Sequence, residues 1–205
     1  MNMNVLRIGH RGSKGYVAEN TLESINHAIL LGVDGIEIDI FKCLSGELVL
    51  SHENDLKRLT GKSGQLEKLT LGELKKFLVV GKYKIPTLID VLKTIETPLF
   101  VNIELKGLNT AQATSKIITN LSKSTSWRLE NFIISSFNWN ELEQFRSIDK
   151  NTPVGVLVSN SMSINKAIKF GKKINAQAIH PNFKLLNEKT VKKIKNNGFK
   201  IYTWT

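Results

Sequence analysis

Apolar, β-branched runs alternate with amphipathic stretches along almost all of the 205 residues. The apolar runs have strand length, and most stretches between them repeat apolar residues at helical spacing. Strand followed by helix, repeated along a chain, predicts parallel strands joined by right-handed crossovers. Seven strands are predicted, which favours a (β/α)-barrel over an open sheet. They cover residues 5–9, 35–40, 99–105, 131–135, 154–158, 176–180 and 199–204, and the helices between them cover residues 21–31, 88–95, 110–122, 139–147, 164–172 and 188–197.

One segment, about residues 43–83, interrupts this alternation between the second and third strands. It contains a short hairpin-like piece that ends at Ser51 and a predicted helix after Thr70. The insertion follows the carboxyl end of the second strand, and barrel enzymes carry their active sites at this end of the strands. We therefore expect one barrel domain over residues 1–205, with the insertion next to its active site.

Two predicted core strands carry charged residues on one face. Side chains i and i+2 share a face of a strand, so Glu37 and Asp39 point the same way. In the next strand Glu104 and Lys106 share a face. Buried carboxylates are costly unless a cation compensates them, and hard oxygen ligands without nearby Cys favour Mg²⁺ or Ca²⁺. The pattern predicts a metal held by Glu37, Asp39 and Glu104; the alternative is structural ion pairs to Arg11 and Lys106.

Basic and histidine side chains lie near these carboxylates in the predicted fold. His10 and Arg11 end the first strand, where Arg suits a phosphate and His exchanges protons near neutral pH. His52 ends the hairpin strand of the insertion and is a candidate second proton-transfer group. Lys106 either neutralises Glu104 or contacts the phosphate. Phosphate bound by a metal and cations, with two histidines beside it, describes phosphodiester cleavage by general acid–base catalysis.

The first predicted helix is preceded by Glu19-Asn20-Thr21. Asn20 or Thr21 is expected to cap this helix, since both side chains accept hydrogen bonds from free backbone N–H groups. Glu19 is a candidate brace for Arg11 or for the metal site.

The net charge of +11 is concentrated near the C-terminus, where residues 150–205 contain eleven Lys and one Glu. Such a region is either an anion-attracting surface or a solvated lysine-rich helical face. No aromatic residues interleave with the lysines as a single-stranded nucleic-acid platform requires, so we expect no nucleic-acid partner. No apolar run approaches the roughly 20 residues that span a bilayer, so no stable membrane anchoring is expected. The single Cys43 excludes an internal disulfide and suits a reducing compartment, and we expect a cytoplasmic protein.

At these residues the chain resembles the glycerophosphodiester phosphodiesterase family. The ordered matches extend over essentially the whole chain, and the set is far more specific than any one piece. The matches are His10-Arg11-Gly12, Glu19-Asn20-Thr21, Gly35-Ile36-Glu37-Ile38-Asp39, His52, Arg58-Leu59-Thr60, Ile103-Glu104-Leu105-Lys106, Ser135-Ser136-Phe137, His180-Pro181 and Tyr202-Thr203-Trp204-Thr205.

The resemblance implies a TIM (β/α)8 barrel with a small insertion after strand two. It also implies hydrolysis of glycerophosphodiesters to glycerol 3-phosphate and an alcohol, assisted by a divalent cation. The roles carried over are metal ligands at Glu37, Asp39 and Glu104, acid–base groups at His10 and His52, phosphate contacts at Arg11 and Lys106, and Trp204 beside the glycerol. The substrate is then a small molecule. The head group, the choice of metal, the oligomeric state and the nucleophile, water or the substrate's own hydroxyl, stay open.

Two departures from the family pattern bear on this interpretation. Glu53 follows His52 where the family usually has Asp, which would orient the histidine. Family members also continue past the Trp-Thr motif with a helix and an eighth strand, whereas this chain stops at strand seven. We therefore expect a barrel that is incomplete at its C-terminus and a functional polypeptide that is longer. The alternatives are a lysophospholipase D-like lipid hydrolase, helped by the basic C-terminal quarter, and a catalytically silent phosphate-binding barrel.

Overall fold

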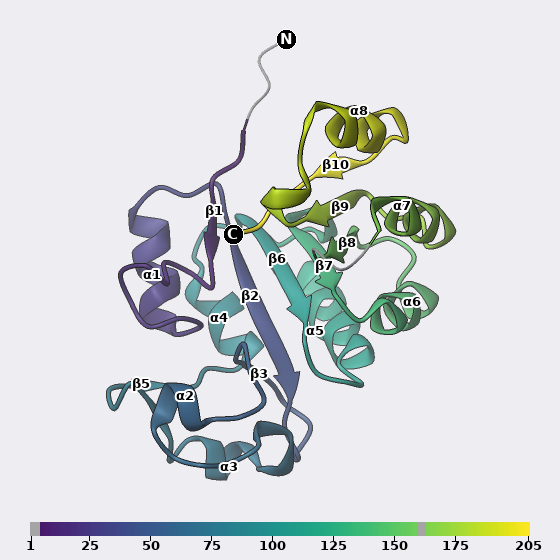
Figure 1. Cartoon of the computed structure of the whole chain (residues 1–205). Helices are drawn as coiled ribbons and strands as arrows, with labels where there is room; N and C mark the ends of the chain where they lie inside the picture. Colours follow the sequence, from purple (N-terminus) through teal and green to yellow (C-terminus); the bar gives the residue numbers. More distant parts are fainter. Residues whose placement is uncertain (1–4, 160–162) are drawn as a thin grey trace.

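The computed structural model describes residues 5–159 and 163–205. Within these ranges seven strands run parallel to their neighbours in a curled sheet, in the order β1-β2-β6-β7-β8-β9-β10 (Figure 1). This arrangement confirms the predicted barrel-type fold. The strands are β1 (Ile8–His10), β2 (Gly35–Lys42), β6 (Phe100–Leu105), β7 (Phe132–Ser136), β8 (Val154–Val158), β9 (Ala178–Pro181) and β10 (Lys200–Ile201).

Helices follow most strands and lie on the outer side of the curled sheet (Figure 1). They are α1 (Leu22–Leu30), α4 (Leu88–Thr94), α5 (Ala111–Ser124), α6 (Trp139–Ile148), α7 (Ile164–Lys173) and α8 (Glu188–Asn196). Their apolar faces pack on the outward-facing strand residues, of which Ile36, Ile38 and Ile40 are fully buried. Since strand side chains alternate, the intervening residues Glu37 and Asp39 point into the barrel. The burial of the isoleucines thus places both carboxylates on the inner face.

The insertion lies between β2 and α4, at the carboxyl end of β2 (Figure 1). Its first strand, β3 (Leu48–Leu50), pairs antiparallel with β2. The remaining elements are α2 (Lys57–Thr60), the 3₁₀ turn η1 (Leu66–Lys68), α3 (Leu71–Leu74), β4 (Leu78–Val79) and β5 (Tyr83–Lys84). A hydrophobic cluster of its own, which includes Leu56, Leu66 and Leu74, holds the segment together. The insertion is therefore a packed unit on the side of the barrel where the carboxyl ends of the strands lie.

The two edge strands are shorter than the sequence predicted. Residues 5–9 and 199–204 were expected to form strands, but β1 and β10 contain only three and two residues. Among the described residues, β1 forms a ladder only with β2, and β10 only with β9. A strand with one neighbour makes half of the possible ladder hydrogen bonds, so its ends are less well fixed. The eighth strand and the longer polypeptide stay a prediction.

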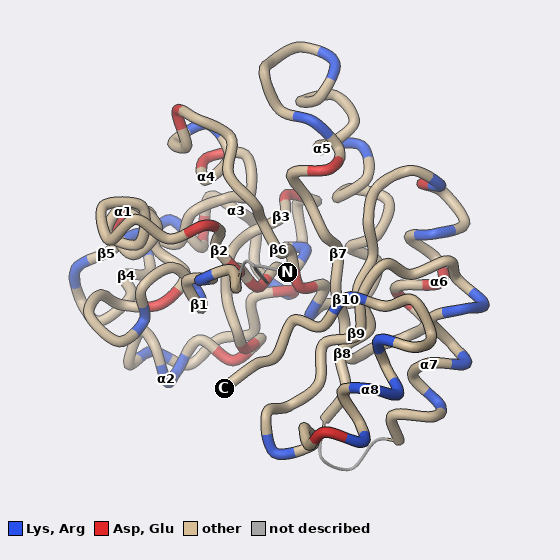
Figure 2. Tube along the Cα trace, turned by 90° about the horizontal axis from the view of Figure 1, so that it is seen from above, with Lys and Arg blue, Asp and Glu red and all other residues tan. Residues whose placement is uncertain are grey.

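The lysines of the C-terminal quarter lie on the outer surface. Figure 2 shows basic residues along α7 and α8, and Lys166, Lys169, Lys189 and Lys193 are all exposed. No helix in the described residues is both long and apolar enough to cross a membrane.

Candidate active site

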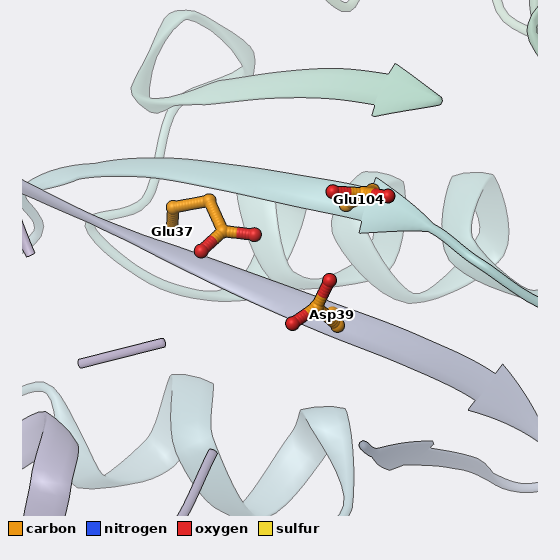
Figure 3. A group of neighbouring side chains, drawn as sticks. All are labelled: Glu37, Asp39 and Glu104. Carbon is orange, nitrogen blue, oxygen red and sulfur yellow. The ribbon is translucent and has the colours of Figure 1, made fainter. Parts of the chain in front are cut away.

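Three carboxylates from two neighbouring strands lie close together on the inner face of the curled sheet (Figure 3). Glu37 and Asp39 come from β2 and Glu104 from β6, and the strand register pairs Asp39 with Glu104. One ligand oxygen of each residue lies within 4.8 Å of those of the other two. Asp39 is 1% exposed and Glu104 8%. The prediction that these side chains form one cluster is confirmed.

The electrostatics of this cluster favour a bound cation. Burial raises the pKa of Glu37 well above its ordinary value, and the nearby charges of Asp39 and Glu104 raise it further. Burial and the charge of Asp39 also raise the pKa of Glu104 to about 7, against the opposing effect of Lys106. Among the described residues no group donates a hydrogen bond to the buried Oδ1 of Asp39. A free buried oxygen in an all-carboxylate set fits a hard divalent cation.

Arg11 approaches the cluster through both its backbone and its side chain. Its N–H donates to Glu37 Oε2 over 3.0 Å, and its Nε lies 3.3 Å from Asp39 Oδ2. Arg11 and Gly12 both have positive φ, 54° and 79°. A Cβ at Gly12 would lie 2.5 Å from Ser24 Oγ, so only glycine fits this turn. The turn therefore presents a backbone donor and a guanidinium to the carboxylates.

Lys106 supplies the second side-chain cation. Its Nζ lies 3.2 Å from Glu104 Oε1 and 3.3 Å from His52 Nε2. The ion pairs of the alternative interpretation are thus present at both Arg11 and Lys106. These two cations do not neutralise the negative charge of the site, because Arg11 also donates to a further carboxylate, Glu19, over 2.9 Å.

Both predicted proton-transfer residues reach the same region. His10 Nε2 lies 3.8 Å from Glu37 Oε2, and burial followed by the charge of Arg11 lowers its pKa to about 4. His52 Nδ1 lies 3.7 Å from Glu53 Oε1. Burial lowers the pKa of His52, although the charge of Asp39 acts in the opposite direction. Both imidazoles have pKa values below the ordinary one, which favours the neutral, proton-accepting form near pH 7.

A pocket of about 210 Å³ joins these groups, with an aromatic wall facing the charged ones. The wall includes Phe137, Tyr202 and Trp204. The Trp204 indole donates from Nε1 to the His180 carbonyl over 3.0 Å and packs edge-on against the Phe137 ring. Of the predicted site residues, those that line the pocket are His10, Arg11, Glu37, His52, Glu104 and Trp204. The pocket therefore has charged and histidine side chains on one side and aromatic side chains on the other, an arrangement that suits a small substrate with a phosphate and an apolar part.

Asn20 is a site residue that the sequence interpretation missed. Thr21 is the observed cap of α1, accepting from Ser24 N–H, and this leaves Asn20 free for another contact. Its Nδ2 donates to Asp39 Oδ2 over 3.0 Å, and its Oδ1 accepts from the Asp39 N–H. Asn20 has a φ of 55°, a conformation that Asn adopts more readily than most residues. No signal in the sequence indicates this contact, because it depends on the loop conformation that brings Asn20 next to Asp39.

His180 also lines the pocket, at the end of β9. It is 2% exposed, and burial lowers its pKa to about 3. A Cβ at Gly155 of β8 would lie 2.2 Å from its Nε2. The glycine therefore provides the space that this imidazole occupies.

Comparison with known proteins agrees with this geometry. The sequence model of the Glycerophosphoryl diester phosphodiesterase family matches residues 10–205. A glycerophosphodiester phosphodiesterase of Caldanaerobacter subterraneus subsp. tengcongensis is 30% identical over 99% of this chain and 86% of that protein. The Thermotoga maritima glycerophosphodiester phosphodiesterase structure aligns with a TM-score of 0.83 and 30% identity, over 100% of this chain and 87% of that one. An Oleispira antarctica phosphodiesterase, solved with the product sn-glycerol-3-phosphate, aligns with a TM-score of 0.86 and 26% identity, over 97% and 83%. The chain belongs to the glycerophosphoryl diester phosphodiesterase family.

Proposed function

We propose that this chain hydrolyses glycerophosphodiesters to glycerol 3-phosphate and an alcohol, with a divalent cation and two histidines. The observation that carries the proposal is the buried cluster of three carboxylates beside a pocket that His10 and His52 also line. Family membership supports the reaction. The product bound to the structurally similar Oleispira antarctica phosphodiesterase supports the glycerol phosphate part of the substrate.

Glu37, Asp39 and Glu104 would hold the cation, and their oxygen-only donor set suits Mg²⁺ or Ca²⁺. When bound, a divalent cation offsets the charge of the carboxylates and stabilises negative charge on phosphate oxygens.

Arg11 and Lys106 would bind the phosphate. Both cations lie within 3.3 Å of a carboxylate in the cluster, so a phosphate bound to a cation there would be close to both of them. A guanidinium can offer two parallel donors to phosphate, whereas the lysine acts as a point charge. Trp204, with Phe137 beside it, would pack against the glycerol.

His10 and His52 would move the protons. One imidazole accepts a proton as the attacking oxygen, of water or of the substrate's own adjacent hydroxyl, bonds to phosphorus. If the substrate's hydroxyl attacks, the product of this step is a cyclic phosphate, and water must then open it to give glycerol 3-phosphate. The other, protonated once phosphate is bound nearby, donates a proton to the alcohol oxygen as its bond to phosphorus breaks. The low pKa values of the two free imidazoles favour the form needed in the first step.

Product analysis on a panel of substrates tests the proposal. The purified protein is incubated with several glycerophosphodiesters and with a lysophospholipid, and released glycerol 3-phosphate and alcohol are measured. We expect glycerol 3-phosphate from at least one water-soluble diester. Release of head group from the lysophospholipid alone would favour the lysophospholipase D-like alternative, and substrate binding without turnover would favour the silent barrel.

A further inference from the structure

Arg58 of α2 joins the insertion to the first strand–helix loop of the barrel. Its Nη2 donates to Glu19 Oε1 over 2.7 Å, and its Nη1 donates to Glu19 Oε2 over 3.4 Å. Its Nε donates to Glu53 Oε1 over 2.8 Å. One guanidinium therefore contacts carboxylates that lie on two segments separated by more than thirty residues of sequence.

These contacts extend in both directions to proposed catalytic groups. Glu19 Oε1 also accepts from Arg11 Nη1 over 2.9 Å. Glu53 Oε1, which Arg58 holds, lies 3.7 Å from His52 Nδ1. From Arg11 to Glu53 these side chains alternate in charge, and the imidazole of His52 ends the series. We call them the Arg58 bridge: Arg11, Glu19, Arg58, Glu53 and His52.

His52 depends on such support because it does not lie on a barrel strand. It follows β3, in the insertion, and its Nε2 faces Lys106. Its Nδ1 lies 3.7 Å from Glu53 Oε1, beyond hydrogen-bond distance, so the position of this long carboxylate side chain decides whether the two groups can pair. Glu53 is 40% exposed, so burial alone does not fix its conformation. The hydrogen bond from Arg58 restrains it.

We propose that Arg58 is a positioning residue that sets the place of His52 relative to Arg11 by clamping Glu53 and Glu19 together. The inference rests on the proposed function, in which His52 transfers a proton and Arg11 binds phosphate. Arginine suits this role because its planar fork binds one carboxylate through two nitrogens and still offers Nε to another. Burial alone would raise the pKa of Glu19, but Arg58 and Arg11 outweigh it and lower that pKa, which keeps the carboxylate charged.

Substitutions at Arg58 test the inference through kcat and KM. Arg58→Met keeps most of the side-chain length and removes the charge. Arg58→Lys restores the charge but not the fork. Because a displacement of about 1 Å at a reacting group can cost about 100-fold in rate, we expect Arg58→Met to lower kcat by about 10–100-fold, with a smaller change in KM. Arg58→Lys should recover part of the loss. The matched control is Arg7→Met, which breaks an arginine–carboxylate ion pair away from the pocket. Arg7 directly precedes β1 and its partner Asp34 directly precedes β2, so this change should leave kcat and KM unchanged.

A double-substitution cycle distinguishes positioning from general destabilisation. If Arg58 acts through Glu53, the Glu53→Gln change should cost much less in Arg58→Met than in the wild type. Additive losses, or an Arg58→Met enzyme whose folded fraction keeps kcat within twofold of wild type, would overturn the inference and leave the proposed function intact.

Backbone hydrogen exchange tests the same contact without turnover. Arg58→Met should speed the exchange of residues 52–60 and of the loop 11–21, and Arg7→Met should not. If the wild type releases no glycerol 3-phosphate, the proposed function fails, but faster exchange still supports the clamp. Unchanged exchange in Arg58→Met would refute it.

Discussion

Glu104 should destabilise the protein when no cation is bound, and the size of this effect follows from its pKa. Burial and Asp39 raise that pKa from 4.5 to about 7 in the folded protein. Each unit is worth roughly 1.4 kcal/mol, so ionised Glu104 costs about 3 kcal/mol relative to its protonated form. Because the folded state binds the proton more tightly than the unfolded state, the free energy of unfolding decreases as pH rises from about 4.5 through about 7.

Glu104→Gln removes this charge while keeping the length of the side chain and an oxygen that can face Lys106 Nζ, which lies 3.2 Å from Oε1 in the wild type. In EDTA at pH 8 we expect the variant to be more stable than the wild type by up to about 3 kcal/mol. Near pH 5 the advantage should largely disappear. Excess Mg²⁺ or Ca²⁺ should reverse the order at pH 8, because the intact carboxylate cluster gains stability from binding and the variant does not.

Urea denaturation followed by tryptophan fluorescence measures these differences at each pH. The partly buried His10 and the buried His180 also have lowered pKa values, which makes stability rise with pH up to about 6.5. Comparing wild type with variant at each pH removes that shared contribution. Glu143→Gln, on an exposed ion pair with Lys173, is the control and should change stability by less than about 1 kcal/mol. A stability difference that does not depend on pH, or a Glu104→Gln variant less stable than the wild type at pH 8 in EDTA, would show that ionised Glu104 does not destabilise the cation-free protein.

Three further substitutions have defined outcomes. His10→Ala and His52→Ala should each lower kcat about 100-fold or more with a smaller change in KM. The control His27→Ala, which changes a histidine of α1, should not lower kcat. Near-normal turnover of the His10 or His52 variant in steady-state assays would exclude the substituted histidine as an acid or base. Gly155→Ala would place a Cβ 2.2 Å from the buried β9 imidazole and should lower the free energy of unfolding by about 1–3 kcal/mol, measured in urea. Gly72→Ala in α3, whose new Cβ would meet no atom closer than 4.0 Å, should not be destabilising, and equal losses in both variants would contradict the account.

The carboxylate cluster could be predicted because strand geometry is strict. Alternation on β2 places Glu37 and Asp39 on one face. Ile36 and Ile38, on the other face, pack in one apolar cluster with residues of the outer helices, which leaves the carboxylates on the inner face of the barrel. Parallel neighbours then bring Glu104 alongside. Each step depends on local periodicity, which a sequence displays directly.

Contacts made by loops could not be predicted in the same way. Asn20 reaches Asp39 only because its backbone adopts a positive φ before α1 begins. Arg58 reaches Glu19 only because the insertion packs against the first loop, where Ala18 joins the hydrophobic cluster of the insertion. Such contacts depend on tertiary packing, for which the spacing of residues gives no signal.

We expect the hydrolysis of glycerophosphodiesters by this chain to require a divalent cation at the three carboxylates. The most direct measurement is a titration of Mg²⁺, and separately of Ca²⁺, into chelator-stripped protein, with glycerol 3-phosphate release and bound cation measured together. We predict that with at least one of these cations activity rises from background and saturates as one cation binds per chain. Glu37→Gln, which alters one proposed ligand, should weaken cation binding. The cation concentration for half-maximal activity should then rise by the same factor as the concentration for half-saturated binding. Full activity in the stripped protein, or cation binding that saturates without any release of glycerol 3-phosphate, would contradict this expectation.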